Sequence, residues 1–490
     1  MKSISLPPYA PTLIESTRAI GYTLEAAVAD IIDNSISAMA SCVDIFFFPT
    51  GNSYIAILDD GCGMNAQGLD NAMRYGSQNP NAKRTENDLG RFGLGLKTAS
   101  LSQCRILTVV TKQRESIEAR CWDIDHVISA QDWSLLILES DDEINNIPHI
   151  DKLKDIESGT LVVWQNLDRL NIGELNFECS MGKKMNDIRN HLSLVFHRYI
   201  SGEPNLRKIK IRMNNICVDS ADPFLSHRNT QIMSDEAILC EGSRITIRPY
   251  ILPHLSDLNQ YEIETLGGKD GLRKNQGFYV YRNKRLLIWG TWFRMMRQGE
   301  SSKLARVQID IPNELDTLWT LDIKKSTAMP PEIVRNNLSS IIEGLAEKSK
   351  KTWVFRGKRE TDESVVHIWQ RFRGKNDGFF YKINRDHPLI KVFSEKSPKI
   401  KNSIESLLKT IEIGIPFNQL YVDLTSEKQI KNDIELSEKE IEEIVNGLLE
   451  QFSTKTAAYN MLEQLSMTDP FINYPNIINR YKGEYLNGGK

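Results

Sequence analysis

The sequence predicts an α+β protein built of several domains. At 490 residues, the chain is longer than one hydrophobic core usually supports, and roughly two to four domains are expected. An amphipathic helical pattern lies near the N-terminus, and runs with the composition of β-strands follow it. A sheet covered by helices is therefore expected for the first part of the chain.

The composition is that of a globular protein, with 40% hydrophobic and 26% charged residues. The formal net charge of −3 excludes binding to polyanions through overall charge, so any nucleic-acid surface would be a local patch. The seven cysteines show no C-x-x-C spacing, which predicts reduced thiols rather than zinc or disulfides. The first residues lack the apolar core of a signal peptide, and no apolar run approaches ~20 residues, so we expect a cytoplasmic protein without a membrane span.

The first predicted element is a helix over Thr17–Ala40. Its apolar residues recur at helical spacing and form one buried stripe: Ile20, Leu24, Ala27, Val28 and Ile31. Asp30 and Asn34, one turn apart, lie on the border of that stripe, whereas Asp33 projects further from it. Because an amide oxygen is a hard metal ligand and an acid polarises water, this flank suits a magnesium–water–phosphate site. Taken alone, the pattern also fits a solvated helix edge.

Two strands, Val43–Phe48 and Ser53–Leu58, are predicted to form a hairpin that delivers Asp59 at its end. A carboxylate there can accept a hydrogen bond from an exocyclic amine such as that of adenine. Gly61 and Gly63 would let a planar base approach the backbone. A single D-x-G-x-G is also a common turn signal.

The polar segment Ser77–Asp88 has the composition of a loop that closes over a ligand. Gly90, Gly93 and Gly95 follow and run directly into a predicted helix. Glycines that open a helix expose backbone N–H groups and the positive end of the helix dipole, which is where phosphates bind. Lys97 would either reach a phosphate or lie exposed on the helix.

Further strands are predicted at 105–111, 116–122, 134–138 and 158–164. Thr160, at the start of the last of these, would donate its hydroxyl to Asp59 through water.

Four motifs in this order resemble the ATP-binding fold called GHKL, shared by gyrase B, heat-shock chaperones of the ninety-kilodalton class, histidine kinases and MutL. They are Asp30 with Asn34, Asp59 to Gly63, Gly90 to Gly95, and Gly159-Thr160. The resemblance implies the Bergerat α/β sandwich, ATP and Mg²⁺ as ligands, Asn34 as the metal ligand and Asp30 as the group that positions the attacking water. It places at the nucleotide Asn34, Asp59, Gly61, Gly63, Met64, Gly90, Arg91, Phe92, Gly93, Leu94, Gly95, Lys97 and Thr160.

The segments L-G-R-F-G-L-G-L-K-T-A-S and G-T-L-V-V-W-Q-N-L resemble the MORC branch of this superfamily and its bacterial relatives. Hydrolysing members usually have Glu where this chain has Asp30, which is shorter by one methylene. The departure implies slower turnover or altered geometry, with Asp33 as the alternative base.

The segment Gln276–Leu286 is predicted to be a strand, a tight basic turn and another strand. It resembles the S5-like transducer domain that follows the ATPase in MORC, MutL and gyrase B proteins. That domain usually gives a lysine to the γ-phosphate, which implies Lys325, or else its neighbour Lys324. The expected domains are residues 1–172 for ATP binding, 173–345 for the transducer and 346–490 for a mostly helical C-terminal region, available for dimerisation or partner binding.

A basic run with interleaved aromatic residues opens the C-terminal region and fits either nucleic acid or a solvated linker: Lys348, Lys350, Lys351, Trp353, Phe355, Arg356, Lys358 and Arg359. Further on, Ser437–Phe452 is predicted to be an amphipathic helix that packs on its own domain or on a second copy.

The resemblance implies an ATP-hydrolysing, ATP-gated dimeric clamp that closes through its N-terminal domains in DNA transactions or bacterial antiviral defence. Candidate contacts to DNA phosphates are Arg282, Lys284, Arg285, Arg294 and Arg297. Two alternatives stay open: a weakly hydrolysing regulatory subunit that recruits an effector from another chain, and a chaperone-like ATPase acting on protein.

Overall fold

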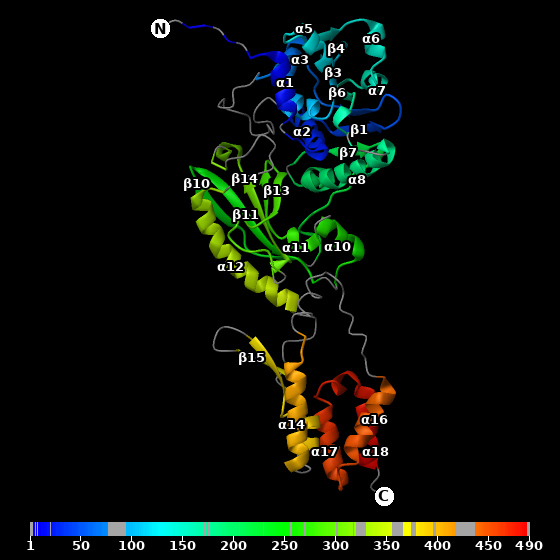
Figure 1. Ribbon diagram of the computed structural model, residues 1–490, viewed down its shortest axis with the longest axis vertical. Coiled ribbons are helices and arrows are strands. Elements are labelled where there is room, and N and C mark those ends of the chain that lie inside the picture. The colour runs from blue at the N-terminus through cyan, green and yellow to red at the C-terminus, as the bar shows by residue number, and fades with distance from the viewer. Residues whose placement is uncertain are drawn as a thin grey trace. The chain divides into compact units, whose positions relative to one another are not determined.

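The computed structural model describes the chain except for residues 1–2, 5, 7, 20, 77–94, 171–172, 174–175, 205, 229, 255–256, 269–270, 300–301, 317, 320–329, 355–365, 374–378, 395–397, 417–436 and 488–490. By its own contacts the chain divides into two units, Met1–Arg356 and Gly357–Lys490, each with its own hydrophobic core. Figure 1 labels the elements of both.

The N-terminal helical segment is two helices, α1 (Ala10–Arg18) and α2 (Leu24–Ser37), not the single helix predicted over Thr17–Ala40. The helix is interrupted because Gly21 has a φ of +77° and because the Thr23 hydroxyl accepts a hydrogen bond from the amide of Ala26, 3.3 Å away. Thr23 is therefore an N-cap. A positive φ and an N-cap both mark a helix start, and they outweigh the apolar periodicity that suggested continuity.

The first sheet has eight strands in the order β5-β4-β3-β6-β2-β1-β7-β8. Only β1 and β7 run parallel among its neighbouring pairs in the described chain. The strands are β1 (Cys42–Phe48), β2 (Tyr54–Asp59), β3 (Ile106–Gln113), β4 (Ser116–Asp123), β5 (Leu136–Leu138), β6 (Ser158–Gln165), β7 (Lys210–Met213) and β8 (Ile216–Cys217). The predicted hairpin and the four later strands are confirmed as β1 to β6.

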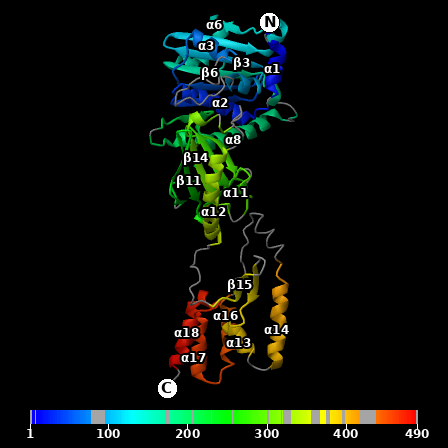
Figure 2. The same ribbon diagram turned by 90° about the vertical axis from the view of Figure 1, so that its left-hand side faces the viewer.

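Helices cover both faces of this sheet: in Figure 1, α2 and α7 (Ile150–Lys154) lie on opposite sides of β3 and β6, and Figure 2 views the same part from the side of α2. Apolar residues of α1, α2, α3 (Ala66–Met73), α4 (Gly95–Leu101), α5 (Ile124–Ala130) and α8 (Phe177–Val195) share one core with one face. Residues of α7 pack with the opposite face, and α6 (Asp141–Asn145) adds Ile144 there. This α/β sandwich confirms the predicted fold class.

The second sheet has six strands, ordered β10-β11-β14-β12-β13 with β9 paired to β11. They are β9 (Gln231–Ile232), β10 (Glu236–Cys240), β11 (Ser243–Ile251), β12 (Gly277–Arg282), β13 (Arg285–Thr291) and β14 (Ala305–Ile311). The predicted strand, tight basic turn and strand over Gln276–Leu286 are confirmed as β12 and β13. Three helices accompany the sheet: α10 (Gln260–Gly267), α11 (Gly271–Lys274) and α12 (Glu332–Val354).

Two clusters of buried side chains pack against this second sheet. Apolar residues of α12, including Val334 and Leu338, pack in one large core with residues of the strands. A second cluster is aromatic and contains Phe224, Tyr250, Tyr279 and Tyr281. The second sheet thus lies beside α8 and the short α9 (His197–Ser201), since Leu194 packs on the aromatic cluster.

Residues beyond 172, the predicted end of the first domain, belong to the first sheet. β7 and β8 pair onto β1, and the first core reaches as far as Val218. The first sheet extends past residue 172 because β7 pairs in parallel with β1. Parallel strands need a long connection between them, and α8 forms part of that connection. The boundaries at 172 and 345 stay predictions as limits of independent domains.

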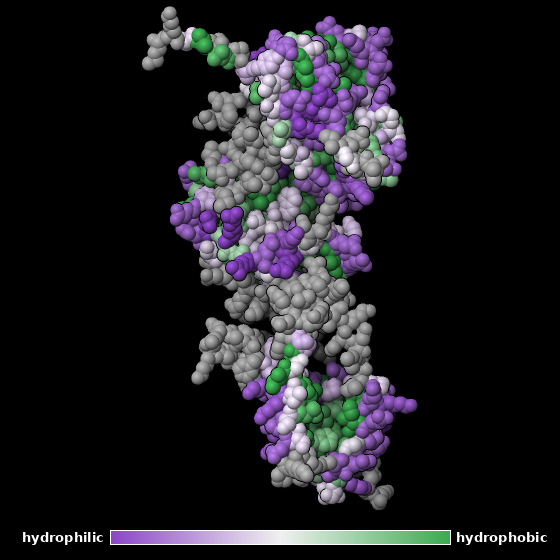
Figure 3. All heavy atoms as spheres, viewed as in Figure 1, coloured by the Kyte–Doolittle hydropathy of each residue, from purple (hydrophilic) through white to green (hydrophobic). Residues whose placement is uncertain are grey.

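The unit Gly357–Lys490 combines a two-stranded sheet with helices. Its elements are β15 (Trp369–Arg373), β16 (Phe379–Ile383), α13 (Pro388–Ser394), α14 (Pro398–Ile413), α16 (Glu438–Leu449), α17 (Lys455–Leu465) and α18 (Pro475–Asn487). The predicted helix near Ser437–Phe452 is confirmed as α16, which buries Ile441, Val445 and Leu448 in the core of its own unit. Figure 3 shows hydrophobic side chains gathered between α14 and α16.

No helix among the described residues combines the length and the apolar character that crossing a bilayer requires. The side chains of the predicted basic run at 348–359 lie outside the described residues.

Candidate nucleotide-binding site

Asp59 ends β2 as a buried hydrogen-bond acceptor, 7% exposed. Its Oδ2 accepts a hydrogen bond from the Ser35 hydroxyl at 2.8 Å, and its Oδ1 accepts one from the Gly61 amide at 2.9 Å. Burial raises the pKa of this carboxyl, and the hydrogen bonds from Gly61 and Ser35 oppose that rise. The backbone amide of Thr160 gives this carboxylate a third hydrogen bond, and since two carboxylate oxygens offer about four acceptor sites, one site is left for an amine donor.

The register of the first sheet brings two predicted motifs together. Asp59 lies directly opposite Thr160 in the antiparallel pair of β2 and β6. The Thr111 hydroxyl on β3 accepts from the amide of Met64 at 2.8 Å and donates to the carbonyl of Gly159 at 3.2 Å. The loop after β2 is therefore tied to β3 and β6, and this tie fixes the direction of the Asp59 side chain.

The glycines of this loop are required by close backbone packing. A Cβ on Gly61 would lie 2.9 Å from the Cβ and carbonyl oxygen of Ala38, and one on Gly63 would lie 2.0 Å from the carbonyl oxygen of Lys112. Packing of the chain against itself therefore explains the need for glycine at both positions, and the prediction that they leave room for a base stays a prediction.

Gly63→Ala is expected to lower the free energy of unfolding by about 3 kcal/mol, through a left-handed φ and a steric clash. Gly51→Ala is the matched control, because Gly51 has a φ of +58°, close to the +62° of Gly63, but has no atom within 4 Å of its Cβ position. Gly51→Ala should lower the free energy of unfolding by about 1 kcal/mol. Urea denaturation of both variants measures the difference, and equal losses would show that the clash is relieved without cost.

Asp30 lies on α2 with 6% of its surface exposed. The Tyr22 hydroxyl donates to its Oδ2 at 3.1 Å. A Cβ built on Gly95 would lie 3.7 Å from the same oxygen, so the first residue of α4 lies beside this carboxylate. The structure thereby brings together the predicted acid and the end of the predicted glycine-rich loop.

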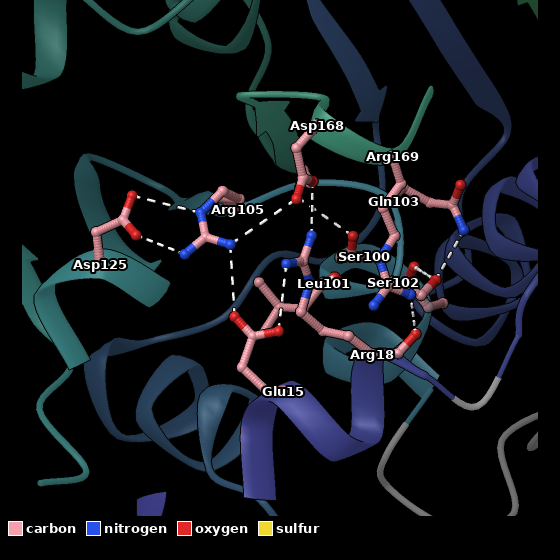
Figure 4. Close-up of polar contacts among 12 residues, drawn as sticks. Glu15, Arg18, Ser100, Leu101, Ser102, Gln103, Arg105, Asp125, Asp168 and Arg169 are labelled. Atoms are coloured by element: carbon pink, nitrogen blue, oxygen red, sulfur yellow. Dashed lines mark hydrogen bonds and ion pairs between the residues drawn. The ribbon is translucent and has the colours of Figure 1, made fainter. Parts of the chain in front are cut away.

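A polar network around α1 and the end of α4 supports Tyr22, and Figure 4 shows it. Arg18 donates to the carbonyl of Leu101 at 2.7 Å and to Asp168 at 2.6 Å. Gln103, just after α4, donates to the carbonyl of Tyr22 at 3.2 Å. The segment between α1 and α2 is thus held at both ends, which orients the Tyr22 hydroxyl toward the acid.

The structure contradicts the expected position of Asp33. This residue is 1% exposed and does not project away from the buried stripe. The reason is an arginine on β13: Arg285 donates through Nε to Oδ1 of Asp33 at 3.2 Å. Asn34, by contrast, is exposed, and within the described chain its side-chain amide makes no hydrogen bond, which leaves the oxygen available to a metal ion.

Lys97 is 1% exposed, so it is not the exposed helix lysine that was one of the two expectations. Its Nζ donates to the carbonyl of Ala72 at 2.8 Å, in the last turn of α3. Burial lowers the pKa of this ammonium to about 8.

The low pKa of Lys97 predicts a specific pH dependence of stability. Between the folded value of about 8 and the ordinary 10.5, the unfolded chain holds a proton that the folded chain has lost, so stability rises with pH across that window. Relative to Lys97→Met, the wild type should gain about 3 kcal/mol between pH 7 and pH 10.5. Chemical denaturation of both proteins at several pH values checks this, and parallel curves would contradict it.

Several predicted site residues lie outside the described part of the chain: Gly90, Arg91, Phe92, Gly93, Leu94, Lys324 and Lys325. Their roles stay predictions.

Two of the candidate DNA contacts are wrong. Arg282 and Arg285 are 3% and 6% exposed, and both are paired with carboxylates, Arg282 with Asp316 at 2.8 Å. Arg294 and Arg297 are exposed, and Lys284 is half-buried.

Four residues near the candidate site were not predicted from sequence: Tyr22, Ser35, Thr111 and Arg285. Ser35 could have been found, because it follows Ile31 by four positions and so places a hydroxyl on the buried stripe. Tyr22 and Thr111 act through loop and sheet geometry that no local pattern carries.

Comparison with known proteins agrees with this geometry. Residues 22–160 match a family model described as histidine kinase-, DNA gyrase B-, and HSP90-like ATPase. A DNA mismatch repair protein MutL from Paramagnetospirillum magneticum is 33% identical over 119 residues, which are 23% of this chain. The chain spans about a fifth (19%) of the length of that curated relative. With its sandwich fold and its ordered motifs, the N-terminal part of this chain belongs to the GHKL superfamily of ATPases.

Proposed function

We propose that this chain binds ATP with Mg²⁺ and hydrolyses it. The observation that carries the proposal is the convergence of Asp30, Asp59 and Gly95, which come from three separate segments, around α2. Ser35 on α2 bonds Asp59, and Asp30 on the same helix lies beside Gly95 at the start of α4. Adenine would be recognised at Asp59 and the phosphates would extend toward α4.

The residues present fit a Mg²⁺ ion. Asn34 would hold it through its exposed amide oxygen, which is a hard ligand of the kind that Mg²⁺ prefers. The ion would neutralise phosphate charge. Asp30 would accept a proton from the attacking water, with its Oδ2 oriented by the Tyr22 hydroxyl. The ion pair between the Asp33 carboxylate and Arg285 argues against Asp33 as the alternative base.

We further propose that the protein works as an ATP-gated homodimer in DNA transactions of the kind that MORC-like proteins perform, including bacterial antiviral defence. Support comes from the similarity to a DNA mismatch repair protein and from three cations on the loops of the second sheet: Lys284, which is half-buried, and Arg294 and Arg297, which are exposed. Lys284 has a carboxylate, Asp310, 3.8 Å away, so Arg294 and Arg297 are the better candidates for DNA phosphates.

A weakly hydrolysing regulatory subunit is the second candidate function. The observation that favours it is the identity of residue 30: an Asp reaches less far than the Glu of hydrolysing relatives, and its carboxylate is buried and already bonded to Tyr22. In that case ATP binding, rather than turnover, would recruit an effector from another chain.

The test is ATP binding and turnover by the full chain, measured with and without long duplex DNA at several salt concentrations. Binding that requires Mg²⁺, turnover that DNA stimulates, and dimer formation with a non-hydrolysable ATP analogue are expected. Dimerisation without turnover would favour the regulatory subunit. DNA binding that depends neither on salt nor on the analogue would overturn the clamp.

A further inference from the structure

Arg285 connects the second sheet to the acids of α2. It is the first residue of β13, 252 positions after Asp33, and its Nε lies 3.2 Å from Oδ1 of Asp33. Its Nη2 lies 4.0 Å from Oδ1 of Asp30. One guanidinium therefore faces both carboxylates, and all three side chains are at most 7% exposed.

The position of Arg285 is set by contacts from β13 itself and from the segment that joins α8 to α9. Its Nη1 donates to the carbonyl of Leu286 at 2.9 Å, and its guanidinium lies over the ring of Phe196, 5.8 Å from the centroid. The turn before it is held as well, because the Tyr199 hydroxyl donates to the carbonyl of Asn283 at 2.6 Å. Long side chains held at several points have few alternative rotamers.

Neighbouring pairs fix the same turn to α9. The Arg198 guanidinium donates to Asp310 on β14 at 2.6 Å, and His197 forms a hydrogen bond with the Tyr281 hydroxyl at 2.8 Å. The relative placement of β13 and α2 is thus determined by a buried polar array. Arg285 is the member of that array that reaches the acids.

Charge explains what Arg285 does there. Asp30 and Asp33 are three positions apart on one helix, so their side chains are neighbours. Two buried carboxylates at such a distance repel one another, and the guanidinium that faces both of them offsets this repulsion. An acid that takes a proton from water must also be held in one orientation.

We propose that Arg285 is a positioning residue for the ATP hydrolysis proposed above. By pairing with Asp33 and facing Asp30, it holds the Asp30 carboxylate in its orientation toward Gly95. Because Arg285 belongs to the second sheet, turnover requires that sheet to be docked on α2. This role rests on the proposed function. What it adds is that the hydrolytic step depends on the docking of β13 against α2.

The experiment compares Arg285→Gln, Arg285→Lys and the double variant Arg285→Gln/Asp33→Asn in the full chain. Arg285→Gln should lower kcat at least ~30-fold and leave the KM for ATP within ~3-fold of the wild-type value. The reason is that the substitution affects the acid and leaves the contacts to the nucleotide unchanged. Arg285→Lys, which keeps the charge, should retain more activity. The double variant should recover kcat to within ~10-fold of the wild type, because a neutral amide at position 33 no longer repels Asp30.

Arg282→Gln is the matched control. Arg282 begins the same turn, is equally buried and pairs with Asp316 inside the second sheet's own domain, so its loss should lower stability without changing kcat more than ~3-fold. Binding of a fluorescent ATP analogue at one site per chain confirms folding of every variant.

The outcomes separate the two proposals. Wild-type kcat in Arg285→Gln, or a double variant no faster than the single one, would overturn the role of Arg285 while hydrolysis stands. A wild-type chain that binds the ATP analogue and never hydrolyses ATP would overturn the hydrolytic function, and with it the positioning role.

Discussion

Asp30→Asn is expected to abolish most ATP turnover while the protein still binds the nucleotide. The change is nearly isosteric, so the hydrogen bond from Tyr22 and the packing of α2 can remain. An amide cannot take a proton from water, and loss of a general base costs ~10²–10⁴ in rate. We therefore expect kcat to fall at least ~100-fold with the ATP dissociation constant changed less than ~3-fold.

Asp30→Glu is the control for this variant. It keeps the carboxylate and supplies the longer acid, so it should retain at least ~10% of the wild-type kcat if the proton acceptor is what matters. Single-turnover kinetics with equal loading of ATP measure the chemical step for each variant. Turnover by Asp30→Asn at the wild-type rate would assign the base to another residue.

Asp59→Asn is expected to weaken ATP binding at least ~10-fold, and up to ~100-fold, while leaving the fold intact. The carboxylate accepts from Ser35 and Gly61, and an amide replaces one acceptor by a donor. The side chain then offers one acceptor fewer to the amine of adenine, and a donor left unmet in the complex costs ~1–3 kcal/mol of binding free energy. Isothermal titration with ATP measures the loss.

Stability should not fall with Asp59→Asn. Burial raises the pKa of Asp59, so the folded chain binds its proton more tightly than the unfolded chain, and stability is lost as pH rises through the folded pKa. At neutral pH, Asp59→Asn removes the free-energy cost of burying an ionised carboxylate. Asp60→Asn is the matched control, because Asp60 is exposed and bonds only the backbone amides of Ser41 and Cys42 in the described chain. An equal loss of affinity in both variants would argue against adenine recognition by Asp59.

The strands of the first sheet were predictable because local patterns determine them. Alternation of apolar residues and the turn at Gly51 predicted β1 and β2, and the sheet register then places Asp59 opposite Thr160. The superfamily was predictable for a related reason: its motifs lie at strand ends and helix starts, which short patterns mark.

The burial of Asp33 was not predictable from periodicity. A stripe assumes one buried face, but nine residues of α2 are buried, including Leu24, Asp30 and Asp33. Other elements, α4 and α8 among them, pack on further sides of α2, and the partner of Asp33 is an arginine 252 positions away. Two basic residues in one turn, Lys284 and Arg285, look alike in sequence, and only the tertiary fold decides that the first is half-buried and the second fully buried.

The parallel pairing of β1 with β7 has a consequence for how the protein is made. Cys42 pairs with Lys210, so on a ribosome the edge of β1 stays open until the whole of α8 and the following strand have emerged. Non-local pairing of this kind is slow, and an unpaired edge invites association with other chains. The first sheet can therefore be completed only after residue 213 has been synthesised, well past the last of the four sequence motifs.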